Sequence, residues 1–494
     1  MWPFLLLVFL SGACTMTLEL VASRLVAPVL GVSLYTWTSV IGVVLAGMSA
    51  GSFVGGWMAD RSNARALLGP VLIASGLVTS LIVPANPVLG IALPAIKYTL
   101  LRVVVPVAIL FGIPSFMIGL VSPLVYRICL TDLHRTGITV GRLAASGSLG
   151  SIAGTFATGF YLIPRFGTRA IVFGVAAVLM GLGILSIPWR RKGTTAIGML
   201  LVLGLVAGGL YGLQFGLRYY YGDDILIESA YYAIRVTTEE RPGGGKLKKL
   251  VLDHLIHSAT DPDDPDYLWY EYERVVAWIV KNLGKSDMSA LFIGGGGYTL
   301  PHWLERNYPK SQVEVVEIDP EVTRVALKEF VPGSKRITSY NEDGRTALRN
   351  LPSGKKYDFV FGDAFNDVSV PYHLTTVEFG TAVQNRLRDG GVYVANVIDK
   401  SSGPFLKAFA ATLASVFTHV VILPGSDAAY AGGRSPHLVV ASNVEMPFST
   451  WAAPTDVSFA VNPQPAPPSG IVLTDDYAPV DFLLLPVFDE KIGR

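Results

Sequence analysis

Cysteine is almost absent from this sequence, and histidine never recurs at the spacing of a metal site. Cys14 and Cys129 are the two cysteines among 494 residues, and the seven histidines form neither an HxH nor an HExxH pattern. A disulfide framework is therefore excluded. We expect no metal centre, because the usual spacings of zinc ligands are missing.

Charge is also scarce. Charged residues make up 16% of the chain, the formal net charge is +1, and no basic run is interleaved with aromatic residues. We therefore expect no nucleic-acid partner. Hydrophobic residues are abundant instead, at 51%, and the mean hydropathy is +0.46 although the second half of the chain is visibly more polar.

The first half of the chain consists largely of apolar runs. Each is about 20 residues long, the length with which a helix crosses a bilayer, and charges fall mainly between the runs. We expect residues 1–217 to form an α-helical transmembrane bundle of seven or eight helices in the inner or plasma membrane. The runs lie near residues 3–22, 36–58, 67–86, 103–126, 143–163, 169–188 and 195–215.

Small residues recur within these runs. Gly47, Gly51 and Gly55 are four residues apart, a spacing that lets helices pack closely and favours a tight bundle over an open pore. The first run contains an acid, Glu19, with Arg24 near its end. An intramembrane acid is a functional candidate, but we prefer an ion pair with Arg24 or snorkelling to the interface.

The charges between the runs give conflicting indications of topology. Lys and Arg are most frequent in the second, fourth and sixth connections, which favours a cytoplasmic position for those three. Seven crossings would then place the second half outside, whereas a nucleotide cofactor requires it in the cytosol. Either an eighth helix lies in the short apolar stretch 87–101, or the weak charge bias misleads. We expect the catalytic half in the cytosol.

The most informative stretch of the second half is SALFIGGGG, residues 289–297, which predicts a buried strand followed by a glycine turn. Glycine lets a backbone approach a ligand closely. Acids follow at the ends of the next three predicted strands: Glu317, Asp343 and Asp363. With helical segments between the strands, the pattern predicts an α/β Rossmann-like sheet that binds a nucleotide-type ligand. Taken singly, such acids and glycines are more often helix caps and turns.

A dinucleotide fits this pattern poorly. Thr299 replaces the last glycine of the G-x-G-x-x-G fingerprint, and acids at the third and fourth strand ends would face a pyrophosphate. Those acids suit a cation. S-adenosylmethionine, or its decarboxylated form, combines adenosine with a positive sulfonium and carries no phosphate, so we expect it as the ligand. Glu317 is well placed to accept hydrogen bonds from the ribose hydroxyls.

Residues 224–400 resemble the spermidine synthase (aminopropyltransferase) family, and the whole chain resembles its membrane-fused members. The resemblance rests on ESAYYAIRV and KLVLDHLIH in a β-hairpin region, and on GGGGYT, VEID, EDG and YDFVFGDAF. It implies a class I methyltransferase-like fold preceded by that region. The segment LTDDYAPVDFL, with Asp475 and Asp476, resembles the one that closes the membrane-fused members.

The resemblance also implies roles for single residues. Glu317 would bind the ribose, Asp343 the adenine edge, and Asp363 would orient or deprotonate the attacking group, with Tyr270 as its catalytic partner. The implied cofactor-binding residues are Gly294, Gly295, Gly296, Gly297, Glu317, Asp343, Gly344 and His257.

Several positions depart from the family pattern. The aspartate of GGGDGG, which in the family helps to hold the amine-bearing part of the substrates, is Gly297, and His257 stands where a glutamine is usual. Glu271 replaces the histidine of YHE, and Asp367 follows Asp363 one residue later than usual. The ammonium groups of a diamine need carboxylates to offset their desolvation. The acceptor is therefore left open.

Three functions are compatible with these features. The first is an integral-membrane enzyme that acts at the gamma carbon of S-adenosylmethionine or its decarboxylated form and releases methylthioadenosine. It would transfer an aminopropyl group to an amine, as in polyamine synthesis, or would cyclise or cleave S-adenosylmethionine itself. The second is methyl transfer to a membrane substrate. The third is a transporter with a nucleoside-binding soluble domain, because GSFVGGWMADR loosely resembles a loop of major-facilitator carriers. We favour the first.

The expected organisation has three parts. These are the bundle over residues 1–217, the β-hairpin region with the first helix over 224–284, and the catalytic domain that binds S-adenosylmethionine over 285–494. The expected partners are the lipid bilayer, a sulfonium nucleoside and a polyamine. A homodimer is suggested by the resemblance, because soluble members of the family assemble through their hairpin regions.

Overall fold

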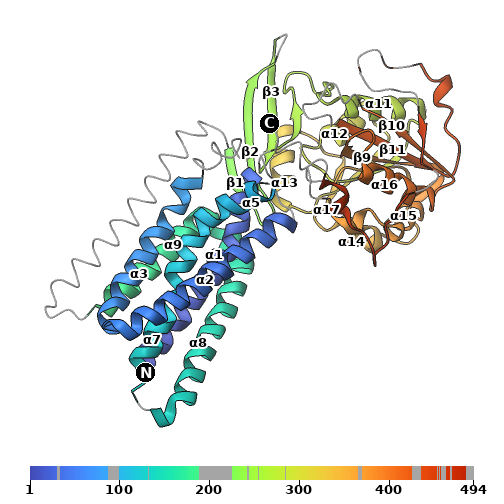
Figure 1. Cartoon of the computed structure of the whole chain (residues 1–494). Helices are drawn as coiled ribbons and strands as arrows, with labels where there is room; N and C mark the ends of the chain where they lie inside the picture. The colour runs from blue at the N-terminus through green and yellow to red at the C-terminus, as the bar shows by residue number, and fades with distance from the viewer. Residues whose placement is uncertain are drawn as a thin grey trace. The chain divides into compact units, whose positions relative to one another are not determined.

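The chain forms two compact units, Met1–Asp223 with Glu228–Ala230, and Asp224–Ile227 with Tyr231–Arg494 (Figure 1). The structure is a computed structural model. It describes residues 1–30, 34–86, 99–131, 133–187, 225–241, 244–253, 255–283, 285–364, 370–425, 435–452, 454, 457, 463–467 and 470–485.

The first unit is a bundle of helices that lie side by side along their length (Figure 1). Helix α1 packs mainly on α8, α3 on α9, and α2 on α6. The α-helices are α1 (Trp2–Leu30), α2 (Leu34–Arg61), α3 (Ala64–Ser80), α5 (Thr99–Val107), α6 (Ile113–Gly119), α7 (Val121–Cys129), α8 (Thr136–Ala157) and α9 (Ile163–Ser186). The short helices are η2 (Ala108–Gly112), η3 (Leu133–Arg135) and η4 (Thr158–Leu162).

Five stretches of this unit are long and apolar enough to cross a membrane, judged by length and composition: Trp2–Ala27, Tyr35–Arg61, Ala64–Asn86, Val103–Cys129 and Arg165–Ser186. They coincide with five of the expected apolar runs. The run near 143–163 is helical in α8 and η4 but does not belong to these five. The run near 195–215, and residues 87–98 of the proposed eighth helix, lie outside the described residues.

Glycines bring helices of the bundle into backbone contact. A Cβ added to Gly51 of α2 would lie 2.1 Å from the carbonyl oxygen of Phe116 in α6, and one on Gly150 of α8 would lie 1.9 Å from that of Phe9 in α1. No side chain fits at such distances. The expectation that small residues allow close helix packing is confirmed at these positions.

The second unit begins with a four-stranded sheet in the order β1-β2-β3-β4. Its strands are β1 (Ile225–Glu228), β2 (Ala233–Glu240), β3 (Lys246–Leu252) and β4 (Leu255–Thr260). Strands β2, β3 and β4 are antiparallel neighbours. Alternate residues such as Ile234, Val236, Leu250 and Leu252 are buried in the core. The sheet contains both segments assigned above to the β-hairpin region.

An eight-stranded sheet follows, in the order β12-β10-β11-β9-β8-β5-β6-β7. The pairs β9–β8, β8–β5, β5–β6 and β6–β7 are parallel, whereas β11 is antiparallel to β9 and to β10, and β10 is antiparallel to β12. The strands are β5 (Ser289–Ile293), β6 (Gln312–Val316), β7 (Ile337–Tyr340), β8 (Tyr357–Gly362), β9 (Leu387–Asp399), β10 (His419–Leu423), β11 (Ser435–Ser442) and β12 (Gln464–Pro465).

Helices cover both faces of the large sheet. Phe292 and Phe361 face a core shared with α11 (Glu271–Leu283), α12 (Thr299–Asn307) and α13 (Pro320–Val325). Leu291 and Val360 face the other core, with α14 (Gly344–Asn350), α15 (Val377–Gln384) and α16 (Pro404–Ala414). This three-layer α/β arrangement is the expected Rossmann-like, methyltransferase-like fold.

The strand order fixes where a ligand can bind. From β5 the chain runs outward through β6 to β7, and then returns to the other side of β5 to form β8. Ligands of open parallel sheets bind at the carboxyl ends of the strands where the order reverses. That point lies between β5 and β8, directly before the glycine turn and Asp363.

Candidate active site

The turn after β5 is held in a conformation that requires glycine. Gly294 has φ 97° and Gly296 has φ 50°. A Cβ on Gly294 would lie 2.2 Å from the carbonyl oxygen of Asp363, so the backbones after β5 and β8 touch directly. Tyr298 has φ 62°, a left-handed conformation that is strained for a bulky residue. Its ring is fully buried, which holds the turn in place.

Glu317, at the end of β6, organises this turn. Its Oε2 accepts hydrogen bonds from the N–H groups of Gly295 (2.9 Å) and Gly296 (3.4 Å), and its Oε1 accepts one from Asp319 N–H (3.0 Å). Burial raises the pKa of Glu317, although these backbone hydrogen bonds lower it. Each carboxylate oxygen has two acceptor sites, so a ribose hydroxyl can still be accepted.

Asp343, at the start of α14, caps that helix. Its Oδ1 accepts hydrogen bonds from the N–H groups of Arg345 (3.1 Å) and Thr346 (2.9 Å), and its Oδ2 lies 2.7 Å from Nε2 of His373. Partial burial raises the pKa of Asp343, but the hydrogen bonds from His373 and Thr346 outweigh it and lower the pKa overall. Gly344 follows, where a Cβ would lie 2.6 Å from Ile293 at the end of β5.

Asp363 lies at the end of β8 and is held by two side chains from other elements. The hydroxyl of Tyr272 in α11 donates to Oδ2 (3.0 Å), and Nδ2 of Asn396 in β9 donates to Oδ1 (2.9 Å). Burial raises the pKa of Asp363 to about 6, although both hydrogen bonds lower it. Burial and the nearby Asp363 raise the pKa of Tyr272 well above its ordinary value, so that its hydroxyl remains a donor.

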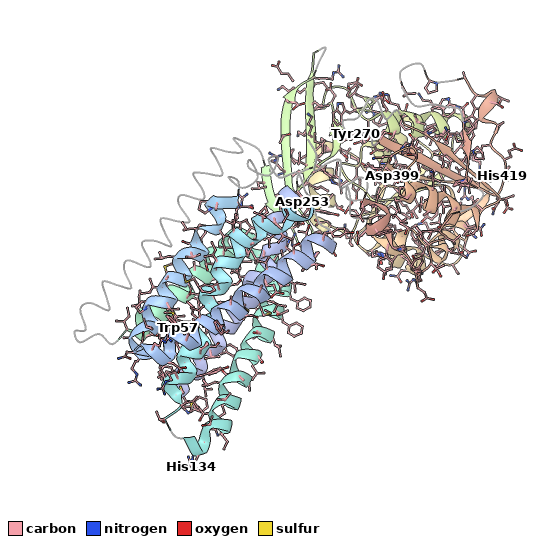
Figure 2. The ribbon with its side chains drawn as sticks, in the orientation of Figure 1. Trp57, His134, Asp253, Tyr270, Asp399 and His419 are labelled. Atoms are coloured by element: carbon pink, nitrogen blue, oxygen red, sulfur yellow. The ribbon has the colours of Figure 1, made fainter. Side chains whose placement is uncertain are left out.

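Tyr270 is placed differently from Tyr272. Its hydroxyl donates to the carbonyl oxygen of Ile256 in β4 (2.5 Å), and its ring stacks on that of Tyr272 with centroids 5.3 Å apart. Figure 2 shows Tyr270 in the ribbon of the second unit. Tyr270 therefore stacks on the ring of Tyr272, and the hydroxyl of Tyr272 contacts the carboxylate of Asp363.

A second buried acid accompanies this pair. Glu273 is 3% exposed, and its Oε2 accepts a hydrogen bond from Tyr270 N–H (3.1 Å) as an N-terminal cap of α11. Burial raises the pKa of Glu273 to about 8; the backbone hydrogen bond opposes the rise and the charge of Asp363 adds to it. The site is therefore rich in carboxyl groups, which favours a cationic ligand.

Strand β4 occupies the space beside Gly297, the position at which the family pattern has an aspartate. The N–H of Gly297 donates to Oγ of Ser258 in β4 (2.8 Å), and a Cβ on Gly297 would lie 2.6 Å from Cβ of Ser258. His257 precedes Ser258, and its carbonyl oxygen would lie 3.8 Å from a Cβ on Gly296. His257 is thus next to the glycine turn through its backbone.

The segment near the end of the chain packs beside α14. Arg345 forms a two-pronged ion pair with Asp475, with N–O distances of 2.6 and 2.5 Å, and Thr376 Oγ1 also donates to Asp475 (2.9 Å). Asp476 is exposed. Asp367 lies outside the described residues.

The structure thus gathers the expected residues around the ends of β5, β6 and β8. Sequence reasoning did not single out Tyr272 or Asn396, which hold Asp363. Tyr272 lies two residues after Tyr270 in the YEY motif, so the sequence offered a second tyrosine at this place. Asn396 carries no local signal. No cluster of three or more His, Cys, Asp or Glu suited to a metal occurs in the described part of the chain.

Comparison with known proteins matches residues 270–403 to the spermine/spermidine synthase domain family. A probable polyamine aminopropyl transferase of Bifidobacterium longum is 38% identical over 138 residues, 27% of this chain and 30% of that protein. A polyamine aminopropyltransferase of Vibrio vulnificus is 37% identical over 144 residues, 28% of this chain and 47% of that protein. The chain thus spans less than half the length of these two relatives.

Solved structures give a weaker likeness. A probable spermidine synthase from Corynebacterium glutamicum aligns with 43% of this chain and 78% of its own, at 25% identity and a TM-score of 0.39. The sequence match covers the helix with Tyr272, the glycine turn, Glu317, Asp343, Asp363 and Asn396. The carboxyl-terminal region of this chain therefore contains a spermine/spermidine synthase domain.

Proposed function

We propose that this chain is an integral-membrane enzyme that cleaves a sulfonium nucleoside at the gamma carbon, with transfer of an aminopropyl group to an amine as the principal reaction. The donor is decarboxylated S-adenosylmethionine, and methylthioadenosine is released. The observation that carries the proposal is the position of Asp363. Tyr272 and Asn396 hold it beside the ends of the neighbouring strands β5 and β8, where the strand order reverses. The matched family supports the reaction class.

The geometry supports a specific division of labour. Glu317 and the turn it organises would hold the nucleoside, and Asp343 lies at the adjacent strand end. Asp363, when ionised, takes a proton from the ammonium of the acceptor. The freed nitrogen lone pair attacks the gamma carbon, the C–S bond breaks, and its electron pair goes to sulfur, which leaves as a neutral thioether. Positioning and this proton transfer are the catalytic contributions of the protein.

One observation favours a second reaction at the same site. Ser258 fills the space beside Gly297, so the turn offers no carboxylate there for an amine. A donor that keeps its own carboxylate meets no opposing charge at this position. S-adenosylmethionine could then react with itself, its carboxylate or amine attacking the gamma carbon to close a ring and release methylthioadenosine.

Mass spectrometry of reaction products distinguishes these reactions. The purified full-length chain is incubated with S-adenosylmethionine alone, and then with the decarboxylated donor plus putrescine. Methylthioadenosine that appears only with the amine supports aminopropyl transfer, and its release from S-adenosylmethionine alone supports cyclisation or cleavage. S-adenosylhomocysteine would identify a methyltransferase. Absence of every product would overturn the proposal and favour nucleoside binding or transport.

The replacement Asp363→Asn tests the proton acceptor. We expect at least a hundredfold loss of turnover, because the amide cannot take the proton, while donor affinity changes by less than about threefold. Isothermal titration with the donor measures binding separately from turnover. Loss of binding in parallel with turnover would contradict the assigned role.

A further inference from the structure

Asn396 is a buried residue of the site that has only one end of its amide in a hydrogen bond within the described part of the chain. It lies in β9, one residue after Ala395, which pairs with Gly362 of β8, so the register places it beside Asp363. It is 3% exposed. Its Nδ2 donates to Asp363 at 2.9 Å, but none of the residues that the structure describes donates to its fully buried Oδ1.

An unpaired amide oxygen in a core is unfavourable. Desolvating an acceptor without a hydrogen bond weakens the fold, whereas an apolar side chain of similar shape would avoid that loss. The neighbouring strand residues are buried and apolar: Val394 and Val397 are 0% exposed. A leucine at position 396 would suit these surroundings, but it would remove one of the two donors to the buried carboxylate of Asp363. The value of asparagine here therefore lies in its contact with Asp363.

The orientation of the amide follows from the chemistry of Asp363. An ionised carboxylate only accepts hydrogen bonds, so the NH₂ end of the amide must face it and the carbonyl end must face away. This orientation is most favourable while Asp363 is ionised, because a hydrogen bond to a charged acceptor is stronger than one to a neutral acceptor. Tyr272 supplies the second donor, from α11, and burial opposes the ionisation of Asp363 that the two donors favour.

We propose that Asn396 is a positioning residue that holds Asp363 ionised and in one rotamer for proton transfer, and that a buried carbonyl oxygen with no donor among the described residues is the structural consequence of this role. The inference rests on the proposed function of Asp363. It assigns Asn396 to act through that carboxylate rather than on the substrate, because its free oxygen is inaccessible.

The test compares Asn396→Leu with the wild-type chain. We expect turnover to fall at least tenfold at pH 7 and the acid limb of the pH profile of kcat/KM to move up by about one pH unit, because Asp363 loses a donor that lowers its pKa. Asn350→Leu is the matched control, because Asn350 also donates to a carboxylate, that of Glu342, at an exposed place. Its pH profile should not move.

A second variant keeps the inference testable if Asn396→Leu fails to fold. Asn396→Asp preserves the shape and replaces the donor by an acid, so it should move the acid limb up further than Asn396→Leu. An unmoved acid limb in a folded variant overturns the inference.

A readout without turnover separates this inference from the proposed function. The raised pKa of Asp363 means that the folded chain binds more protons than the unfolded chain between the ordinary pKa near 3.8 and about 6. Stability therefore falls as pH rises through this window, relative to Asp363→Asn. In the Asn396→Leu background the fall should extend to higher pH. An unchanged window overturns the inference even if the wild-type chain makes no methylthioadenosine.

Discussion

Two tyrosines two residues apart differ in what their hydroxyls contact, and the difference predicts different effects on catalysis. Tyr272 donates to Asp363 and Tyr270 to the carbonyl oxygen of Ile256. We expect Tyr272→Phe to lower kcat by roughly 10- to 100-fold, since a hydrogen bond to a charged group is worth about 1.5–3 kcal/mol. The acid limb of the pH profile should also move up, because a donor that lowers the pKa of Asp363 is lost.

Tyr270→Phe is the matched control. It removes a hydroxyl from the same aromatic stack but leaves the donor to Asp363 in place, so the acid limb should stay where it is in the wild-type chain. Steady-state kinetics between pH 5 and 9 compare the two variants. Equal shifts in both would show that the pair acts only as a packed unit.

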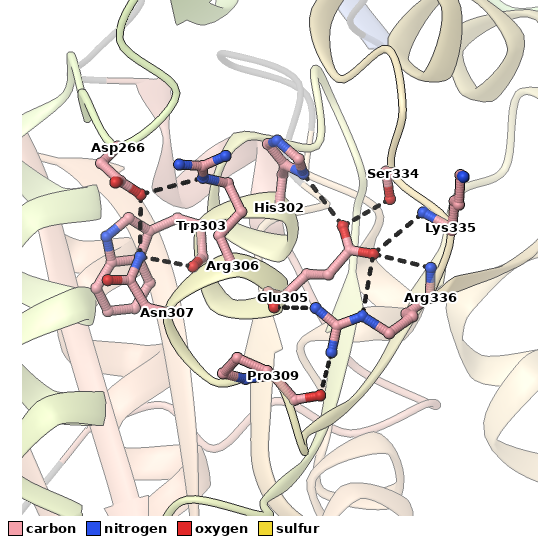
Figure 3. Close-up of polar contacts among 10 residues, drawn as sticks. All are labelled: Asp266, His302, Trp303, Glu305, Arg306, Asn307, Pro309, Ser334, Lys335 and Arg336. Carbon is pink, nitrogen blue, oxygen red and sulfur yellow. Dashed lines mark hydrogen bonds and ion pairs between the residues drawn. The ribbon is translucent and has the colours of Figure 1, made fainter.

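Glu305 in α12 shows a stabilising carboxylate away from the chemistry. Its Oε2 accepts from Ser334 (2.8 Å) and contacts His302 Nδ1 (3.1 Å), and its Oε1 accepts from the N–H groups of Lys335 and Arg336 (Figure 3). Burial raises its pKa, but the hydrogen bonds from Ser334 and Arg336 outweigh this and lower it overall. The carboxylate joins α12, directly after the glycine turn, to the loop before β7.

We expect Glu305→Gln to reduce the free energy of unfolding by about 1–3 kcal/mol at neutral pH, since the amide accepts at one end only. The folded-state pKa is lowered, so the contribution is complete above the ordinary value of 4.5 and disappears as pH falls through the folded value. Melting curves from pH 3 to 8 measure this. Glu321→Gln, in an exposed pair with Arg324, should change stability by less than about 1 kcal/mol.

At the scale of elements, two glycines of α2 allow the effect of helix contact to be distinguished from the effect of helix propensity. Gly51 faces the backbone of α6, whereas an added Cβ on Gly56 meets nothing within 4 Å. We expect Gly51→Val to force the helices apart and to lower the yield of folded protein severalfold, as overpacking of a close contact does. Gly56→Val should be tolerated. Size-exclusion profiles and melting temperatures in detergent compare them; similar losses in both would mean that helix propensity, not contact, decides.

The sequence predicted elements better than partners. The length of the apolar runs indicated the helical unit, and the glycine turn with its acids indicated the α/β sheet, because both patterns are local. The partners of Asp363 come from Tyr272 and Asn396, 91 and 33 residues away, and no local pattern records such contacts. Asp343 has two roles that the sequence alone does not separate, since it caps α14 and also lies beside a strand end of the site.

At the scale of the whole molecule, the five apolar stretches predict how the protein behaves in cells. We expect the full chain to remain in the membrane pellet after an alkaline carbonate wash and to be released only by detergent, because helices of this length and composition favour the bilayer core. The catalytic unit should be cleaved by protease in inverted vesicles but not in intact cells. Release by carbonate, or cleavage in intact cells, would contradict membrane integration or the cytosolic location respectively.

The contact between Gly297 and Ser258 limits how this site can change in evolution. A side chain at position 297 collides with Cβ of Ser258, and Ser258 accepts the hydrogen bond of Gly297 N–H. A mutation that introduces aspartate at 297 therefore meets a blocked space unless position 258 changes too. A change at 258 alone removes the partner of a buried backbone donor. Both single-step routes therefore pass through a less stable chain, and an acid at position 297 requires two coordinated changes.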